Sequence, residues 1–477
     1  MRNEADTRAE LIDPQLVEAG WGSSVNPETE IKREFLISPG QVGPGHNDET
    51  RSVADYVLIY KNRKLAVIEA KKEELDVSEG VGQAKDYAKK LNLNTAFAAN
   101  GKEIYQISME TGQEGPADSF PTPDELWTKT FKQKNEWIES FNTIPFEFSD
   151  PRHTIRFYQE IAVNNVMQAI AEDKKRILLT LATGTGKTFI AAQIAWKLFK
   201  TKWNLKKDKK RSPRILFLVD RNILADQAFL AFGSFSNDAL TRIDPTDIRR
   251  RGGVPKNATV FFTIYQTFMT GKNDQPWFKE YSKDFFDFII VDECHRGGGN
   301  DESAWRKILD YFNPAVQLGL TATPKRDDNT DTYEYFGKPV YEYSLKEGID
   351  DGFLTPFKVQ NIQTTIDEYT FTGEDTVIEG NPEQGDSYGE DAFNNIIIIE
   401  ERERKRVQEL IKVTNKDDKT IVFCANQKHA ALIRDLINQE SESTSPEYCV
   451  RVTADEGRIG DTHLKRFQDN EKLLDRK

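Results

Sequence analysis

The chain has 477 residues, 38% of them hydrophobic and 30% charged, and its formal net charge is −13. At about 150 residues per domain, this length predicts roughly three domains. No apolar run approaches the roughly 20 residues of a membrane-spanning helix, and the charged start MRNEADTRAE predicts no secretory signal. Cys294, Cys424 and Cys449 form no CxxC pair, which argues against structural zinc and favours a reducing, cytoplasmic location.

The charge is distributed unevenly along the chain. Residues 151–260 contain 21 Lys and Arg but only 9 Asp and Glu. A basic block inside an acidic chain predicts a local phosphate-binding surface, and DNA is its expected ligand. The stretch LKKDKKRSPR at 205–214 also has the composition of an ordinary solvated loop, so both interpretations stay open for it.

Residues 1–107 predict a compact α/β domain. We expect, in order, a helix at 5–19, a strand at 30–37, a hairpin of strands at 53–60 and 64–71, and a helix at 81–91. Asp55 begins one strand of the hairpin, and Glu69 and Lys71 end the other, so the three side chains can meet at one end. Glu69 and Lys71 are two residues apart and project to the same face.

Two carboxylates at that place, Asp55 and Glu69, can hold a divalent cation, with the carbonyl oxygen of Ala70 as a further ligand. Lys71 can orient or deprotonate an attacking water and stabilise the charge that develops on a phosphate. The arrangement resembles the PD-(D/E)xK nuclease fold, in which these three residues match the catalytic positions. Ala54 stands where that family usually has Pro, a departure that leaves the ligands unchanged.

The resemblance extends to the neighbouring helices. It implies that Gln83 and Tyr87 form the QxxxY element of the restriction-enzyme branch, and that Glu10 on the first helix is a further acidic position of the site. Residues 108–150 are rich in Pro, Gly and acidic residues and predict a linker. Within it, Trp127 and Trp137 are expected to pack as anchors.

The stretch RILLTLATGTGKT at 176–188 precedes the helical pattern FIAAQIAWKLF. An apolar strand, a Gly-rich turn and a helix in this order predict a phosphate-binding loop, because glycines let successive backbone N–H groups point at phosphate oxygens beside a helix N-terminus. A lysine then meets the β/γ-phosphates of ATP, and a hydroxyl meets Mg²⁺. The predicted contacts are Thr183, Gly184, Thr185, Gly186, Lys187 and Thr188.

Upstream of this loop, Arg156 and Gln159 resemble the adenine-reading element of superfamily 2 helicases, in which the Gln side chain is bidentate to the base. Arg156 could equally be a surface residue of a capped helix. Downstream, strands are expected at 214–220, 258–263 and 288–291. Alternating strands and helices predict a doubly wound parallel sheet with its ligand at the carboxyl ends of the strands. The resemblance to helicases implies that residues 151–342 form a RecA-like lobe.

The last of these strands runs into DECH at 292–295. We predict that Asp292 holds Mg²⁺ through water and that Glu293 polarises the water that attacks ATP. The resemblance to helicases implies that His295 couples this site to the next motif, which comprises Thr321, Ala322 and Thr323.

A second lobe is predicted over residues 343–477. Its sequence contains an acidic, Gly-rich loop at 365–391, an apolar run at 396–399 that predicts a buried turn of helix or strand, a strand at 419–424 and a helix at 427–438. The arginine motif QxxGRxxR, which stabilises the transferring phosphate in superfamily 2 motors, is missing from it. We therefore expect an incomplete lobe, a chain that is a fragment, and very slow ATP hydrolysis.

An N-terminal nuclease fused to a DExH motor resembles the motor-and-cleavage (R) subunit of type I restriction enzymes over essentially the whole chain. Phrases such as FPTPDELW, VDRNILADQA and GLTATP match that family. The resemblance implies a cytoplasmic subunit that joins methylation and specificity subunits, moves double-stranded DNA with ATP and Mg²⁺, and cuts it. Two alternatives are a repair or remodelling helicase with a DNA-binding N-terminal domain, and a type III restriction motor, in which the nuclease usually follows the motor.

Overall fold

The computed structural model describes residues 2–40, 51–132, 134–148, 154–272, 275–294, 302–323, 332–361, 369–370, 377–379, 387–388, 398–415, 418–443, 445 and 447–469. The chain divides into two compact units, Met1–Pro356 and Phe357–Lys477. None of the helices in the described part is long and apolar enough to cross a membrane.

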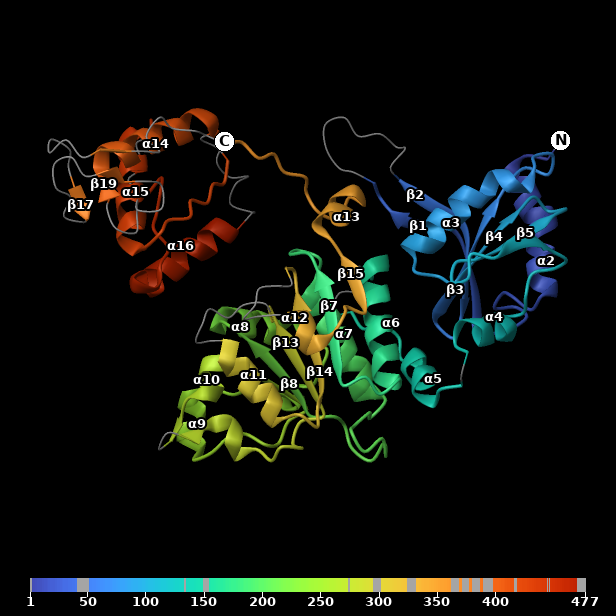
Figure 1. Cartoon of the computed structure of the whole chain (residues 1–477), viewed down its shortest axis with the longest axis horizontal. Coiled ribbons are helices and arrows are strands. Elements are labelled where there is room, and N and C mark those ends of the chain that lie inside the picture. Colours follow the sequence, from blue (N-terminus) through green and yellow to red (C-terminus); the bar gives the residue numbers. More distant parts are fainter. Residues whose placement is uncertain are drawn as a thin grey trace. The chain divides into compact units, whose positions relative to one another are not determined.

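The first unit begins with an N-terminal domain built on a six-stranded sheet of order β1-β2-β3-β4-β5-β6 (Figure 1). Neighbouring strands are antiparallel except β3 and β4, which are parallel and joined by α3 (Val81–Lys90). The strands are β1 (Thr29–Ser38), β2 (Ser52–Tyr60), β3 (Arg63–Ala70), β4 (Thr95–Ala99), β5 (Ile104–Ser108) and β6 (Glu114–Ala117). The predicted hairpin is therefore confirmed as β2 and β3.

Side chains of this sheet alternate between two buried faces, as the period of two in a strand requires. On one face Tyr56, Leu58 and Ile68 pack beneath the first helices, which are α1 (Glu4–Thr7), a π-helical turn η1 (Arg8–Ile12) and α2 (Asp13–Glu18). On the other face Val57 and Val67 pack against α3, in a hydrophobic cluster that continues into the next domain. Both hairpin strands are thereby held rigidly between two layers.

The predicted linker is largely ordered, which corrects the boundary at residue 107. β6 completes the N-terminal sheet, and α4 (Pro123–Thr130) packs on it through Leu126. Trp127 lies edge-on to Tyr60, with 5.7 Å between ring centroids. Trp137, on α5 (Glu136–Thr143), is buried beside helices of the following domain. The stretch has the composition of a linker, but its apolar residues bury enough surface to form two helices, α4 and α5.

The second domain of the first unit is built on a seven-stranded sheet of order β15-β7-β14-β13-β8-β10-β9, and all of its strand pairs are parallel. It is called the parallel-sheet domain here. Its strands are β7 (Arg176–Leu181), β8 (Ile215–Val219), β9 (Leu240–Arg242), β10 (Val260–Ile264), β13 (Phe288–Asp292), β14 (Val316–Thr321) and β15 (Tyr341–Tyr343). The predicted strands and the parallel α/β class of this domain are confirmed.

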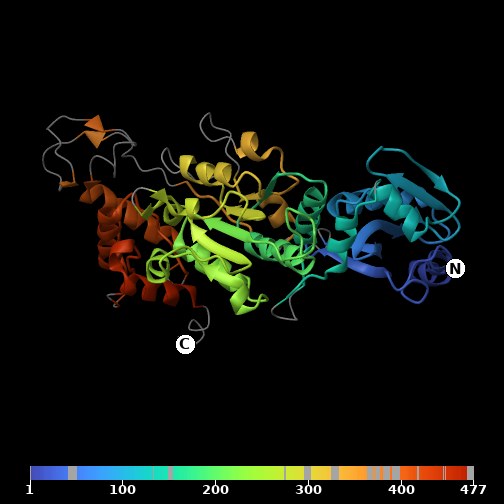
Figure 2. The ribbon, with the colours of Figure 1, turned by 90° about the horizontal axis from the view of Figure 1, so that it is seen from below.

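Helices cover both sides of this sheet (Figures 1 and 2). One face packs against α6 (Phe157–Ala171), α7 (Lys187–Lys200) and α8 (Asn222–Ala231). The other packs against α9 (Pro245–Arg251), α10 (Tyr265–Met269), α11 (Glu302–Tyr311) and α12 (Thr332–Phe336). This doubly wound arrangement leaves the carboxyl ends of the strands free to build a site.

The first unit extends beyond the predicted boundary at residue 343. β15 hydrogen-bonds to β7 as an edge strand of the same sheet, and α13 (Leu345–Asp350) follows before the unit ends at Pro356. The sequence of β15, YEY, is too short to predict a strand. Only its pairing with β7 identifies it as part of this sheet.

The second unit contains α14 (Glu400–Val413), α15 (Gln427–Glu440) and α16 (Arg458–Gln468). The predicted helix at 427–438 is confirmed as part of α15. Short ladders pair β16 (Tyr369–Thr370) with β18 (Ser387–Tyr388) and β17 (Val377–Glu379) with β19 (Ile398–Ile399). Of the predicted loop at 365–391, only β16, β17 and β18 lie among the described residues.

The strand predicted at 419–424 is wrong for this structure: the segment has no strand conformation, and Phe423 is 91% exposed. An apolar run becomes a strand only where a neighbouring strand accepts its hydrogen bonds, and the described part of this unit offers none to it. The assignment of the second unit as a RecA-like lobe therefore stays a prediction.

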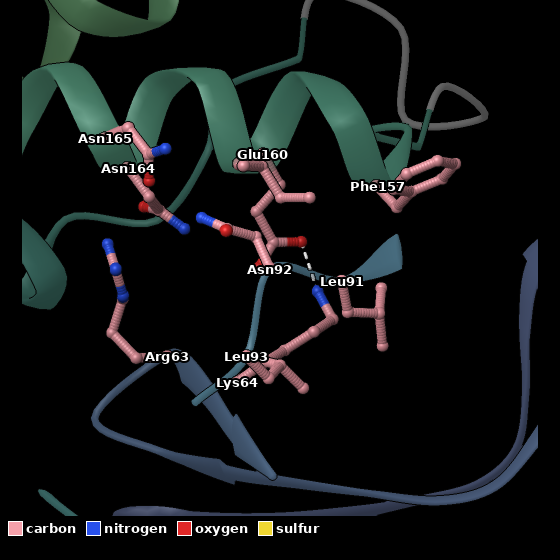
Figure 3. A pocket seen from close by; sticks show the side chains of 10 residues that line it. Arg63, Lys64, Leu91, Asn92, Leu93, Phe157, Glu160, Asn164 and Asn165 are labelled. Carbon is pink, nitrogen blue, oxygen red and sulfur yellow. Dashed lines mark hydrogen bonds and ion pairs between the residues drawn. The ribbon is translucent and has the colours of Figure 1, made fainter. Parts of the chain in front are cut away.

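The N-terminal and parallel-sheet domains also meet at a small polar cavity of about 40 Å³ (Figure 3). Lys64 of β3 forms an ion pair with Glu160 of α6 there. Arg63 lines the same cavity, and burial lowers the pKa of its guanidinium to about 10. The contact ties the hairpin that carries Asp55 and Glu69 to the helix that carries Gln159.

Candidate functional site

The phosphate-loop sequence forms the predicted turn between β7 and α7. Gly184 and Gly186 have φ angles of +85° and +86°, a left-handed conformation that favours glycine. A Cβ on Gly186 would also lie 2.7 Å from the side-chain nitrogen of Gln159. Thr183 and Gly184 are exposed while Thr185 is buried, so the loop presents its backbone outward from a fixed base.

Lys187 and Glu293 meet at the carboxyl edge of the sheet. The Lys187 ammonium lies 3.5 Å from a Glu293 carboxylate oxygen and donates a 3.3 Å hydrogen bond to the carbonyl of Leu181. Glu293 has a φ of +51°, which is uncommon for a residue with a side chain and is often found at functional sites. The structure thus brings together two groups predicted from separate motifs.

Asp292, the last residue of β13, completes this centre. Its side chain is buried, accepts a hydrogen bond from the N–H of Glu293 at 2.9 Å, and has a pKa raised to about 6 by burial and by the Glu293 charge. Lys187 opposes that rise. A buried carboxylate held next to another carboxylate favours a bound cation. Thr188, half-buried at the start of α7, adds a hydroxyl on an adjacent element.

The predicted coupling motif follows β14, the strand that lies between β7 and β13. Thr321 is buried at the end of this strand, and its hydroxyl accepts a hydrogen bond from the N–H of Thr323 at 3.1 Å. Ala322 is half-buried between them. The motif therefore neighbours both β7, which leads into the phosphate loop, and β13, which ends at Asp292. His295 lies outside the described residues.

Gln159 is buried, and both ends of its side chain already have partners. Its amide nitrogen donates to the carbonyl of Thr185 at 2.9 Å, and its amide oxygen accepts from the N–H of Arg156 at 3.1 Å. The hydroxyl of Tyr158 donates to the same carbonyl at 3.0 Å. In this structure Gln159 therefore braces the phosphate loop, and the predicted bidentate contact with a base stays a prediction.

A cavity of about 430 Å³ opens beside the loop, lined by Arg156, Gln159 and the loop glycines. Its other walls include Phe148 and Phe189, which are stacked with centroids 5.9 Å apart. The side chain of Gln193 holds this wall in place, because it accepts from the N–H of Glu147 at 2.9 Å and donates to its carbonyl at 2.6 Å. The sequence analysis did not predict Phe148 and Gln193 as part of this wall. The aromatic residues of FEFSDP at 146–151, close before Arg156, were the one signal in the sequence that could have indicated it.

The second centre lies on the N-terminal sheet, where Asp55 and Glu69 come from neighbouring strands. One oxygen of Asp55 accepts a hydrogen bond from the N–H of Ala70 at 2.8 Å, and the other accepts from the guanidinium of Arg8 at 3.0 Å. Glu69 is buried, and burial together with the Asp55 charge raises its pKa to about 7. Two carboxylates that repel each other in this way favour a cation between them.

Lys71 joins this centre from the residue after β3. Its ammonium donates to Glu69 at 2.8 Å and to the side-chain oxygen of Gln83 at 2.6 Å. Tyr87, on the same helix as Gln83, has a pKa raised by burial and by the charges of Glu69 and Asp55. The structure therefore brings Asp55, Glu69, Lys71, Gln83 and Tyr87 together.

Glu10 lies elsewhere in the domain. Its carboxylate is 60% exposed and pairs with Arg2 at 2.7 Å. Two other residues of the first helical segment act on the centre: Arg8 through its bond to Asp55, and Glu4 through a charge that raises the pKa of Glu69. The π-helical turn changes which side chains of this segment face the sheet. The spacing of a regular α-helix therefore could not predict that Arg8, and not Glu10, reaches the centre.

The second centre offers oxygen ligands for a divalent ion. Among the described residues, no three His, Cys, Asp or Glu side chains gather closely enough to bind a metal by themselves. Asp55 and Glu69 contribute two carboxylates, and a backbone carbonyl such as that of Ala70 can complete an all-oxygen set of the kind Mg²⁺ prefers. The residues present fit that ion.

The chain is similar to known restriction proteins. A family model described as type III restriction enzyme, res subunit, matches residues 152–326, and one described as type I restriction enzyme EcoKI endonuclease subunit second domain matches residues 44–123. The endonuclease subunit of the EcoAI type I enzyme of Escherichia coli is 36% identical over 490 residues, 97% of this chain and 57% of that protein. The EcoKI subunit of E. coli K12 is 26% identical and matches 96% of this chain and 46% of its own. The chain thus spans about half the length of these curated relatives.

A solved fragment assigned to the HsdR subunit of a type I restriction enzyme from Vibrio vulnificus YJ016 has a TM-score of 0.76 and 37% identity, over 98% of this chain and 81% of its own. The chain belongs to the HsdR family. In this HsdR chain the two centres lie in one compact unit, Met1–Pro356, and each is carried by inner strands of a sheet, β2 and β3 in one and β7 and β13 in the other.

Proposed function

We propose that the chain is the restriction subunit of a type I restriction enzyme, which moves double-stranded DNA with the energy of ATP and cuts it. The observation that carries the proposal is the presence of two separate acidic centres, each with a lysine, in one HsdR chain: Lys187 with Asp292 and Glu293, and Lys71 with Asp55 and Glu69. Each pairing suits chemistry on phosphate.

In the parallel-sheet domain, the N–H groups of the loop at 183–188 and the Lys187 ammonium bind the phosphates of ATP. Lys187 leaves Glu293 for the more negative phosphates, and the freed carboxylate of Glu293 orients the attacking water and accepts its proton. Thr188 and Asp292 hold Mg²⁺, which supplies charge neutralisation on the phosphate oxygens. Arg156, Gln159, Phe148 and Phe189 form the wall for the adenine base.

In the N-terminal domain, which we assign to the PD-(D/E)xK nucleases, Asp55 and Glu69 hold Mg²⁺, which polarises the scissile phosphate when bound. Lys71 orients the attacking water and stabilises the charge on the phosphate. Gln83 fixes the Lys71 ammonium through its 2.6 Å hydrogen bond. Arg8 holds the Asp55 carboxylate in place through its 3.0 Å hydrogen bond.

The proposed partners are double-stranded DNA and the methylation and specificity subunits of the enzyme, and the proposed location is the cytoplasm, consistent with three free cysteines. A helicase whose N-terminal domain only binds DNA would need no Lys71 beside two carboxylates, so the geometry favours cleavage. In a type III motor the nuclease usually follows the motor, whereas here the N-terminal centre precedes it.

The decisive experiment measures DNA cutting and ATP hydrolysis by the chain assembled with these partner subunits. Asp55→Ala and Lys71→Ala should abolish cutting and leave ATP hydrolysis nearly intact, while Lys187→Ala should abolish both. Lys85→Ala is the matched control, because it removes a cation of α3 whose ion pair is with Glu114 of β6, away from both centres. Persistent cutting in both nuclease variants would disprove the assignment.

A further inference from the structure

One short segment of the first unit contacts both the N-terminal domain and the parallel-sheet domain. Residues 344–354, here called the bridge segment, comprise α13 and the turn after it and directly follow β15. Tyr343, the last residue of β15, is paired with Leu181, and its carbonyl accepts a 3.0 Å hydrogen bond from the N–H of Ala182. The bridge segment therefore starts beside the residues that open the phosphate loop.

On the side of the N-terminal domain, Asp351 of the bridge segment receives an ion pair from Lys90, the last residue of α3, at 2.8 Å. The Lys90 ammonium also donates to the hydroxyls of Ser38 and Ser52 at 3.0 and 2.9 Å. An ammonium has three donors, so all three are used, and they join β1, β2 and the bridge segment at the end of α3. That helix carries Gln83, the partner of Lys71.

On the side of the parallel-sheet domain, the second oxygen of Asp351 accepts a 2.9 Å hydrogen bond from the hydroxyl of Tyr343. The Tyr343 ring stacks on that of Tyr158, with centroids 4.1 Å apart and planes within 10°. The Tyr158 hydroxyl in turn donates to the carbonyl of Thr185 in the phosphate loop. An unbroken series of contacts thus runs from Lys90 to the loop that meets ATP.

Close packing leaves the bridge segment little room to move independently. A Cβ on Gly352 would lie 1.7 Å from the carbonyl oxygen of Gly40 in the N-terminal domain, and one on Gly184 would lie 3.2 Å from Leu354. Phe353 packs on Tyr158, with centroids 5.4 Å apart. A displacement of the phosphate loop is therefore transmitted to the bridge segment by direct contact, because packed side chains deform little.

We propose that Asp351 and Lys90 are positioning residues that couple the nucleotide state of the phosphate loop to the nuclease helix α3. The inference rests on the proposed function of both centres. Asp351 is buried, and in the described part of the chain Lys90 is the one cation that pairs with it. The two residues therefore move together, because separating them would leave a buried carboxylate without compensation. ATP binding shifts the loop and Tyr158, and Tyr343, Asp351 and Lys90 carry the shift to the helix that holds Gln83 against Lys71.

The test measures amide hydrogen exchange in the 477-residue chain with and without Mg²⁺ and a non-hydrolysable ATP analogue. In the parent, nucleotide should change exchange both at 183–190 and at 81–90. In Asp351→Asn the change at 81–90 should fall about fivefold or more, in line with typical coupling between sites, while protection at 183–190 persists. Asp351→Glu should restore the response, which a lost fold would not allow.

Two further variants keep the test decisive. Tyr343→Phe retains the stacked ring and removes the hydroxyl, which donates to Asp351 at 2.9 Å and lies 3.5 Å from the carbonyl oxygen of Glu347 within the bridge segment. It should weaken the response of α3 even if Asp351→Asn fails to fold. Lys85→Gln, on the same helix but paired with Glu114, should leave the response intact. A response of α3 that is equal in the parent, Asp351→Asn and Tyr343→Phe would overturn the coupling, as would no response of α3 in a parent whose loop is protected. A parent loop that gains no protection would instead overturn the proposed nucleotide site, and the coupling with it.

Discussion

The ammonium of Lys187, at the start of α7, and the carboxylate of Glu293, directly after β13, lie 3.5 Å apart. β7, which leads into the phosphate loop, and β13 are separated in the sheet by β14. Each charge neutralises the other in the absence of nucleotide. A phosphate chain brings more negative charge to Lys187 than Glu293 does, so nucleotide binding should free the carboxylate at the moment when it is needed as a base.

Glu293→Gln should therefore separate nucleotide binding from hydrolysis. The amide keeps the volume of the side chain but accepts no proton, so we expect binding of a fluorescent ATP analogue to persist and phosphate release to fall by about 10²–10⁴-fold. The measurement is made in the assembled enzyme with DNA. Glu342→Gln, on an exposed carboxylate of β15, is the control, and hydrolysis at the parental rate in Glu293→Gln would contradict the assignment.

Glu69 should make the stability of the N-terminal domain depend on pH. Its pKa of about 7 lies above the ordinary value of 4.5, so the folded chain holds an extra proton between these values and the free energy of unfolding falls as the pH rises through that window. Glu69→Gln does not titrate. It should match the parent below about pH 4.5 and exceed it by about 3 kcal/mol above pH 7.

Thermal unfolding of the parent and of Glu69→Gln across this pH range measures the effect. Glu10→Gln, at an exposed carboxylate of the same domain, keeps Glu69 and should therefore retain the pH dependence of the parent. Addition of Mg²⁺ above pH 7 should stabilise the parent and leave Glu69→Gln unchanged. If the free energies of unfolding of the two proteins differed by the same amount at every pH, the raised pKa of Glu69 would be refuted.

Two glycines with similar backbones offer a matched comparison. Gly186 and Gly252 have φ angles of +86° and +75°, but a Cβ would meet Gln159 at 2.7 Å in the first and nothing within 4 Å in the second. Gly252→Ala should cost about 1–2 kcal/mol from the backbone alone. Gly186→Ala should cost about 1 kcal/mol more, since it displaces the hydrogen bonds of Gln159, and it should also weaken ATP binding. Equal unfolding temperatures would show that Gln159 does not brace the loop.

The basic block should bind DNA through α9. Arg249 and Arg251 are exposed there, whereas the 205–214 loop uses Lys207 in an ion pair with Asp173 and Lys209 over the ring of Trp137. Arg249→Glu with Arg251→Glu should weaken DNA binding and flatten its dependence on salt. Lys210→Glu in the loop should change neither, and the opposite pattern would transfer the DNA contact to the loop.

Contiguous motifs made much of the site predictable from sequence. The loop at 183–188 and the DECH stretch each follow one strand, and the hairpin residues Asp55 and Glu69 are close in the chain, so local periodicity was enough to place them. The parallel sheet followed from alternating strands and helices.

The remaining features depend on contacts between distant segments. Arg8 lies in a π-helical turn and meets Asp55 from another segment of the domain, and Asp351 meets Lys90 after β15 has paired with β7, a strand far from it in the sequence. Neither pair leaves a pattern in the sequence. Residues 419–424 have the composition of a strand, but a strand requires a partner, and composition does not supply one.

The contacts between the N-terminal and parallel-sheet domains change what a cut in the chain would do. Lys64 pairs with Glu160 and Lys90 pairs with Asp351 across the two domains, and one hydrophobic cluster continues on both sides. A protease that cuts the chain between α4 and α5 would break the covalent connection but not the assembly. The two pieces should elute together from a sizing column and separate only in denaturant, as two halves of one folded body.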